Sequence, residues 1–290
     1  MPVQEVRELM GMPVTIVVAE NEERASLAVE EAFADFAVLD RTFSPFHPES
    51  AVSRNNRGEL QLGAAGELVA RAVDLCRLYQ QATDGYFSAW PGERFDPSGL
   101  VKGWAIDRAA SILFRHGCRD FYVDAGGDVQ ACGLSIAGGP WRVGIRHPVQ
   151  RHEVVRVILA ADLAVATSGT YEKGDHILNP HTGAPADGWL SFTVIGPDIL
   201  TADVYATAAF AMGEEGLLFI ERTPGYEAYA IDRRLIGSWT SGFDSFCERA
   251  ANDAGAQASV SPGPAGGPGF GRHRGRGSEG GREDAGPSPG

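Results

Sequence analysis

Apolar and polar positions recur along the chain in periods that predict interleaved strands and helices. Residues 14–19 form a continuous apolar, β-branched run, which predicts a buried strand. Asn21 then suits the N-cap of an amphipathic helix. The apolar positions of that helix recur every three or four residues, at Val29, Ala32, Phe33, Phe36 and Leu39. One face of this helix is therefore expected in the core.

The same patterns continue through most of the chain. Residues 43–56 are rich in proline, serine and asparagine, which predicts an irregular loop. Further helices are expected over a stripe from Leu68 to Tyr79, from about residue 102 to before Gly117, and over about 202–212. Further strands are expected at residues 121–124, 141–146, 154–159, 192–195 and 227–231. This irregular succession predicts a mixed α+β fold rather than a doubly wound parallel sheet.

The C-terminal part differs in composition from the rest of the 290 residues. Residues 252–290 are mostly Gly, Pro, Ser and Ala with scattered charges, and such a segment buries too little apolar area to offset its ordering entropy. We therefore expect one folded domain over residues 1–251 and a disordered tail over residues 252–290.

Charge and cysteine content exclude several classes of protein. The net charge of −13 disfavours nucleic acid and anionic lipid as partners. The four cysteines form no Cys-x-x-Cys pair, so neither a structural zinc site nor a redox dithiol is indicated. Residues 1–9 lack the apolar core of a signal peptide, and no run reaches membrane-spanning length. We expect a cytoplasmic protein without membrane insertion.

Two segments combine turn-forming residues with groups that suit an anion. Residues 96–107 run from a turn into a helix, where free backbone N–H groups, Ser98 and Lys102 suit a phosphate. The alternative is an ordinary helix N-terminus. In the second segment, residues 124–128, paired glycines either let a ligand approach the backbone or simply form a tight turn.

A third segment joins small hydroxyl residues to a histidine. Residues 166–171 predict a hydroxyl-rich turn, and His176 begins the run His-Ile-Leu-Asn-Pro-His-Thr-Gly. Such a turn could hold a phosphate, and His176 could act as an acid or base near neutral pH. The alternative is a loop histidine that is hydrogen-bonded to backbone.

A fourth segment places two oxygen ligands on one helix face. Asp203 and Thr207 lie four residues apart in a predicted helix, so their side chains converge. One carboxylate with neutral oxygens suits Mg²⁺, which also takes water and substrate phosphates as ligands. The alternative is an aspartate stabilised by the helix dipole, with Thr207 in the core.

The four segments, in this order, resemble the ApbE family of FAD:protein FMN transferases. The resemblance begins at residues 10–12 and passes through residues 43–50 and Asn55. It continues through the segments DPSGLVKGWAID, AGGD, ATSGTY, HILNPHTG and ADVYATA. Each segment is common by itself, whereas their joint order is specific.

The resemblance implies a single mixed α+β, T-fold-like domain that holds FAD, with the FAD pyrophosphate on Mg²⁺. It places the metal on Asp203, Thr207 and the backbone carbonyl of Val101. Flavin contacts of the family fall on the following positions of this chain: Met10, Phe46, Ser98, Trp104 and Ile177.

Two of the implied flavin positions depart from the family pattern. Phe46 stands where family members often have a tyrosine, so it keeps stacking ability and loses a hydroxyl. The segment Tyr86-Phe87-Ser88 resembles one in which an aspartate often follows the phenylalanine. Ser88 therefore lacks the carboxylate that the family has there.

The implied reaction is attack by a Thr or Ser hydroxyl of an acceptor flavoprotein on the FMN-side phosphorus of FAD, with AMP as the leaving group. We expect His176 to bind the pyrophosphate or to handle a proton, and Lys102 to add positive charge. Exported family members carry a signal peptide, and the lack of one here implies an intracellular acceptor. Two alternatives stay open, namely storage of FAD without transfer and hydrolysis of FAD by water.

Overall fold

The computed structural model describes residues 2–19, 22–150, 152–170, 177–248 and 271–274. Its α-helices are α1 (Glu22–Phe43), α2 (Ala51–Asn56), α3 (Glu67–Ala82), α4 (Ser98–Arg115), α5 (Ile199–Met212) and α6 (Glu215–Glu221). Its strands are β1 (Val3–Leu9), β2 (Met12–Val18), β3 (Phe121–Ala125), β4 (Asp128–Cys132), β5 (Trp141–Arg146), β6 (Val154–Ala160), β7 (Leu163–Gly169), β8 (Trp189–Gly196), β9 (Glu227–Asp232), β10 (Ile236–Trp239) and β11 (Gly271–Arg274).

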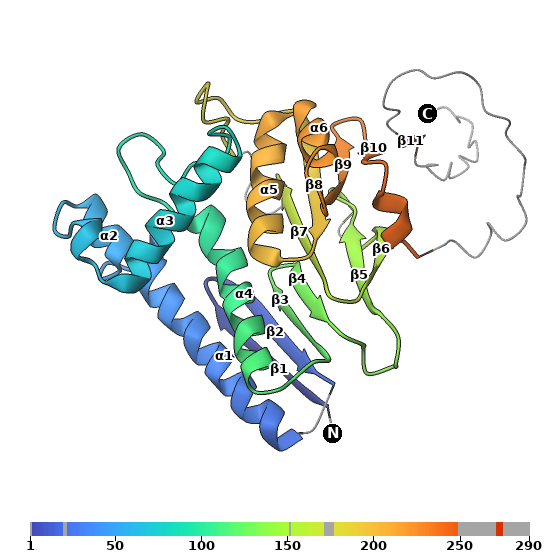
Figure 1. Cartoon of the computed structure of the whole chain (residues 1–290). Coiled ribbons are helices and arrows are strands. Elements are labelled where there is room, and N and C mark those ends of the chain that lie inside the picture. Colours follow the sequence, from blue (N-terminus) through green and yellow to red (C-terminus); the bar gives the residue numbers. More distant parts are fainter. Residues whose placement is uncertain (1, 20–21, 151, 171–176, 249–270, 275–290) are drawn as a thin grey trace, which may run out of the picture.

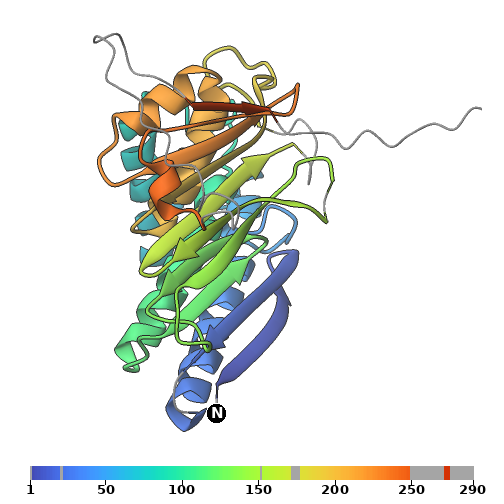
Figure 2. The same cartoon turned by 90° about the vertical axis from the view of Figure 1, so that its right-hand side faces the viewer.

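Most strands belong to one antiparallel sheet. Its nine strands lie in the order β1-β2-β3-β4-β7-β8-β9-β10-β11, and β5 and β6 form a separate hairpin. Helices α1, α4 and α5 cover one face of the sheet, as Figures 1 and 2 show. The predicted α+β class is confirmed.

The sheet has a core on each face because successive side chains of a strand point to opposite faces. On β7, Ala166 faces the helices, whereas Val165 belongs to a second cluster with the β5–β6 hairpin. On β9, Ala230 likewise belongs to the cluster on the helix side and Ile231 to the second cluster. The middle strands of the sheet are therefore covered on both faces.

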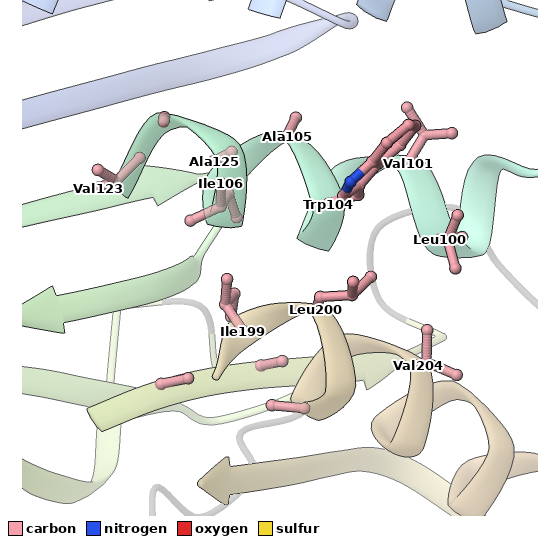
Figure 3. Packing of buried hydrophobic residues seen from close by; sticks show 14 of the residues in the cluster. Leu100, Val101, Trp104, Ala105, Ile106, Val123, Ala125, Ile199, Leu200 and Val204 are labelled. Atoms are coloured by element: carbon pink, nitrogen blue, oxygen red, sulfur yellow. The ribbon is translucent and has the colours of Figure 1, made fainter. Parts of the chain in front are cut away.

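Helix α5 is the central helix of the molecule. Asp198 caps it by accepting a hydrogen bond from the Thr201 amide at 2.8 Å. The helix packs against both the sheet and α4, and Figure 3 shows Leu200 and Val204 of α5 below Leu100 of α4. This packing buries most of the side chains of α5.

Several elements differ from those predicted. Helix α2 lies within the predicted loop, where Ser50 accepts a hydrogen bond from the Ser53 amide at 3.0 Å and so starts a helical turn. Strand β1 alternates half-buried and exposed residues, a strand pattern that its many charges mask. The turn predicted at residues 166–171 is wrong, because Thr167, Ser168 and Gly169 continue β7 and pair with β8. Asn21, the predicted cap of α1, lies outside the described residues.

The tail predicted over residues 252–290 is described only at Gly271–Arg274. These four residues form β11, which pairs with β10 at the edge of the sheet. In the described part of the chain, no helix has the length and apolar character needed to cross a membrane.

Candidate functional site

A large cavity lies beside the first turns of α4 and the middle of α5. Its volume is about 1650 Å³, which exceeds the roughly 300–1,000 Å³ of most small-molecule sites. Its walls come from segments that are far apart in the sequence, including the β1–β2 turn, residues 44–48, residues 85–88, the start of α4, the β3–β4 turn, the end of β7 and residues 177–181. All of the four segments singled out in the sequence therefore contribute to one cavity.

Asp203 and Thr207 project from α5 into this cavity. The helix begins at Ile199 with Asp198 as its cap, so Asp203 lies more than one turn inside it. The alternative of an aspartate stabilised at the helix N-terminus is therefore wrong. The Asp203 side chain is buried, and its Oδ2 accepts a hydrogen bond from the Gly103 amide of α4 at 2.9 Å.

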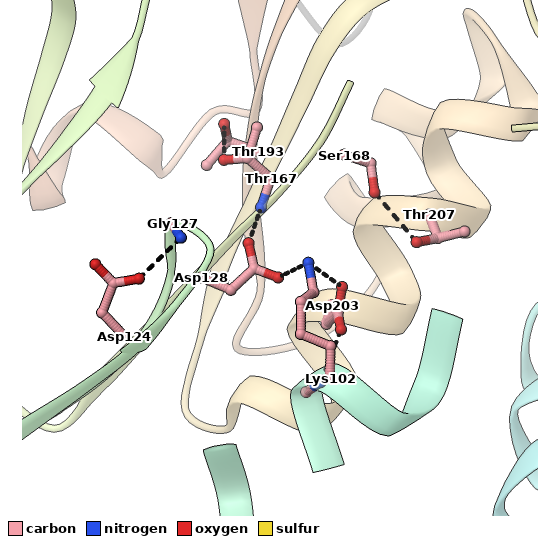
Figure 4. Close-up of polar contacts among 10 residues, drawn as sticks. Lys102, Asp124, Gly127, Asp128, Thr167, Ser168, Thr193, Asp203 and Thr207 are labelled. Carbon is pink, nitrogen blue, oxygen red and sulfur yellow. Dashed lines mark hydrogen bonds and ion pairs between the residues drawn. The ribbon is translucent and has the colours of Figure 1, made fainter. Parts of the chain in front are cut away.

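Lys102 lies between two buried carboxylates (Figure 4). Its Nζ forms an ion pair with Asp128 and lies 3.4 Å from Oδ1 of Asp203. Burial by itself would lower the pKa of Lys102, but the two negative charges raise it above its usual value. Burial raises the pKa of Asp203, against the lowering effect of Lys102. The site therefore holds two acidic side chains around one fixed cation.

Strand β7 completes this polar cluster. Oδ1 of Asp128 accepts a hydrogen bond from the Thr167 amide at 2.9 Å, and Oγ of Ser168 lies 3.1 Å from Oγ1 of Thr207. Figure 4 shows these contacts around Lys102. The sheet and the two helices are thus joined by hydrogen bonds at the wall of the cavity.

The oxygen atoms at this point suit Mg²⁺. Asp203 supplies a carboxylate, Thr207 a hydroxyl, and Val101 lies on the same cavity wall. Among the described residues no three His, Cys, Asp or Glu side chains are grouped so that they could hold a metal ion, so a metal here would depend on neutral oxygens and a bound phosphate. The hydroxyl of Thr207 faces the cavity beside Ser168 and is not confined to the core.

Most of the residues implied as flavin contacts line the same cavity: Met10, Phe46, Tyr86, Phe87, Ser88, Ser98 and Ile177. Phe46 is 92% exposed, so its ring is available to stack on a planar ligand. Met10 has a positive φ of 55° in the β1–β2 turn, where its amide donates to Asp40 at 3.1 Å.

Two of the predicted residues are not placed on the cavity wall. Trp104 is 5% exposed and packs edge-on against Phe43 in the core between α1 and α4. It therefore belongs to the core and not to the cavity wall. His176 lies outside the described residues. Its predicted role stays a prediction.

The start of α4 is only partly available to an anion. Asp96 accepts hydrogen bonds from the Ser98 amide, at 3.0 Å, and from the Ser98 hydroxyl. A phosphate at this helix N-terminus would therefore have to share these donors with Asp96. Lys102, the charge predicted for the phosphate, is held by Asp128 and Asp203.

No role is predicted from the sequence for Asp128 or Arg146. Asp128 follows the Gly126–Gly127 turn, whose φ values of 63° and 95° bring the start of β4 beside α4. Arg146 at the end of β5 lines the cavity beside Asp124. Its charge lowers the pKa of Asp124, although burial raises that pKa overall. Neither contact can be predicted from spacing along the chain, because the tertiary structure brings β4 and β5 to the cavity.

Comparison with solved structures defines the class of fold. The flavin transferase ApbE from Vibrio cholerae matches with a TM-score of 0.74 and 23% identity, over 85% of this chain and 99% of that one. The ApbE protein from Thermotoga maritima matches with a TM-score of 0.75 and 24% identity, over 86% of this chain and 100% of that one. The chain therefore has the α+β fold of these proteins.

Sequence comparison finds similarity to the ApbE family. The model of the ApbE family matches residues 88–230, which include the start of α4, β3–β4, β7 and α5. The FAD:protein FMN transferase of Vibrio cholerae is 33% identical over 157 residues, and that of Haemophilus influenzae is 32% identical over 169 residues. The matches cover 47% and 54% of this chain, and the chain spans about half the length of these curated relatives, 47% and 49% respectively. Over residues 88–230 this chain is therefore similar to the ApbE family.

Proposed function

We propose that this protein is an FAD:protein FMN transferase that moves the FMN half of FAD onto a Thr or Ser hydroxyl of an acceptor flavoprotein and releases AMP. Proteins named for this activity are 33% and 32% identical to this chain, and the range matched by the family model, residues 88–230, contains several segments of the cavity wall. The observation that carries the proposal is the convergence of Asp203, Thr207 and Lys102 at one wall of that cavity.

The proposed metal is Mg²⁺, held by Asp203, Thr207 and the Val101 carbonyl together with the pyrophosphate of FAD. When bound, it would neutralise charge that develops on the pyrophosphate during phosphoryl transfer. The fit rests on the donor set, which has one carboxylate and otherwise neutral oxygens. Mixed ligands of this kind leave coordination positions open for phosphate oxygens.

Residues of the chain divide the remaining tasks. Lys102 offsets part of the negative charge of Asp128 and Asp203 and helps to keep the Asp203 carboxylate in place. Phe46, Tyr86 and Ile177 offer apolar surface for the flavin ring.

In the proposed reaction the acceptor oxygen forms a bond to the FMN phosphorus, and the bond from that phosphorus to AMP breaks. The hydroxyl proton leaves the acceptor in this step, and His176 is our candidate for taking it.

Storage of FAD and hydrolysis of FAD are the competing functions. Transfer, storage and hydrolysis are distinguished by incubating the protein with FAD, Mg²⁺ and candidate flavoproteins and then analysing the products. Transfer gives AMP and an acceptor whose mass rises by one FMN minus water. Hydrolysis gives AMP and free FMN without acceptor, and storage leaves FAD intact. The cytoplasmic location stays a prediction, which cell fractionation tests.

A further inference from the structure

The pairing between β4 and β7 stops before β7 ends. The two strands pair at Val129↔Val165, Gln130↔Ala164 and Ala131↔Leu163. On its other side β7 stays paired with β8 as far as Gly169↔Ser191. In the described part of the chain, the last three residues of β7 therefore have a neighbouring strand on one side only.

Two side chains keep this edge of β7 open. Gly127 would be the next partner of Thr167, but its amide donates to Oδ1 of Asp124 at 2.8 Å. The Thr167 amide in turn donates to Oδ1 of Asp128 at 2.9 Å. Figure 4 shows the contacts of Gly127 with Asp124 and of Thr167 with Asp128.

The alternating direction of backbone groups in an antiparallel strand shows which groups are free at this edge. The Thr167 amide points towards β4, whereas the Thr170 amide points to β8 and donates to the Leu190 carbonyl at 3.1 Å. Since alternate residues direct their backbone groups to opposite neighbours, Gly169 directs its N–H and C=O to the same side as Thr167. Among the described residues, these two groups have no hydrogen-bond partner.

This edge lies inside the cavity and next to the proposed metal ligands. Thr167, Ser168 and Gly169 all line the cavity. Ser168 lies between the two edge-facing residues, and its side chain reaches Thr207 on α5 at 3.1 Å. Unpaired backbone groups at a strand edge are a template for an added strand.

We propose that the free edge of β7 at Thr167–Gly169 binds the acceptor protein, whose modified segment pairs with it as an added extended strand. The proposal rests on the proposed function. It deepens that function, because it names the surface that receives the acceptor and the conformation in which the acceptor is bound.

The geometry also sets the position of the reacting hydroxyl. Side chains of facing residues on neighbouring strands point to the same face, with their Cβ atoms about 4.5–5.5 Å apart. An acceptor residue opposite Ser168 therefore directs its side chain towards Thr207 and α5, as Ser168 does. A Ser or Thr at that position would face the proposed pyrophosphate site, whereas its two neighbours would point away.

Hydrogen–deuterium exchange tests this pairing directly. The probe is the acceptor modified in the assay above, with its reactive Ser or Thr replaced by Ala so that it binds without reacting. We expect this acceptor, added to enzyme saturated with FAD and Mg²⁺, to slow exchange in a peptide covering residues 165–170. Protection by FAD alone, or no protection by the acceptor, would overturn the proposal.

A pair of variants tests the Gly169 amide itself. G169P removes this donor, and G169A keeps it; proline is tolerated at a strand edge whose N–H faces away from the sheet. We expect kcat/KM for the acceptor to be roughly threefold to tenfold lower in G169P than in G169A, which is the range for one lost backbone hydrogen bond. Equal values in two folded variants that bind FAD equally would contradict the pairing.

The outcomes also separate this proposal from the proposed function. Modified acceptor without protection of β7 would leave the transferase function standing and remove the docking edge. If no acceptor is modified by wild-type protein that binds FAD, the function fails and the docking proposal falls with it.

Discussion

The Gly103 amide of α4 donates a 2.9 Å hydrogen bond to Oδ2 of Asp203 on α5. This contact fixes one carboxylate oxygen, while Oδ1 lies 3.4 Å from Nζ of Lys102. The approach requires a glycine, because a Cβ at position 103 would lie 2.8 Å from Cβ of Asp203 and 3.0 Å from the Ile199 carbonyl. Gly103 therefore both allows the close packing of α4 on α5 and orients Asp203.

Gly103→Ala should lower the free energy of unfolding by roughly 1–3 kcal/mol, which is the usual effect of overpacking. At an exposed helix position, Gly→Ala would stabilise the protein by about 1 kcal/mol. The sign of the change in the free energy of unfolding therefore distinguishes a closely packed glycine from an exposed one. Urea denaturation measures the free energy of unfolding, and Ser111→Ala, at an exposed position of the same helix, is the control. A Gly103→Ala protein at least as stable as wild type would show that α4 and α5 are packed less closely.

Lys102→Met should destabilise the protein by roughly 3–5 kcal/mol, because it leaves Asp128 and Asp203 buried without their cation. Arg57→Ala is the matched control, since its ion pair with Glu59 is exposed and exposed pairs contribute about 1 kcal/mol or less. We also expect Mg²⁺ to raise the melting temperature of Lys102→Met more than that of wild type. An equal shift in both proteins would argue against a metal beside these carboxylates.

Removal of residues 253–290 should lower the melting temperature by less than about 4 °C, the shift that a loss of 1 kcal/mol causes in a domain of this size. In the described structure this truncation takes away only β11, a four-residue strand beside β10. Calorimetry of the two proteins measures the difference. A larger fall would mean that the tail is part of the folded domain.

The protein should bind FAD more tightly than FMN, because the adenylate half adds contact surface in a cavity of about 1650 Å³. Fluorescence titration of both flavins at fixed Mg²⁺ checks this. Equal affinities would mean that the cavity recognises only the flavin half.

The sequence predicts most of the residues that line the cavity, and it predicts only some of the strands around them. Asp203 and Thr207 share a helix face, so their convergence follows from the local period of the helix alone. The end of β7 is predicted as a turn, because the small hydroxyl residues from Ala166 onward resemble turn sequence and the pairing that makes them a strand comes from β8. Asp128 and Lys102 meet only because β4 and α4 are brought together by the sheet, and local sequence holds no information on such contacts.

The proposed site as a whole is tested most directly by the rate of FMN transfer to an acceptor as a function of Mg²⁺ concentration, in wild type, Asp203→Asn and Thr207→Val. Asn keeps the size of the side chain and removes the one formal charge assigned to the metal. We expect Asp203→Asn to fold normally by circular dichroism and to transfer FMN roughly a thousandfold more slowly, since a metal supplies several kcal/mol at the pyrophosphate. Thr207→Val should be less severe, because water can replace a neutral ligand. A folded Asp203→Asn protein that transfers FMN at a rate near that of wild type would contradict this account.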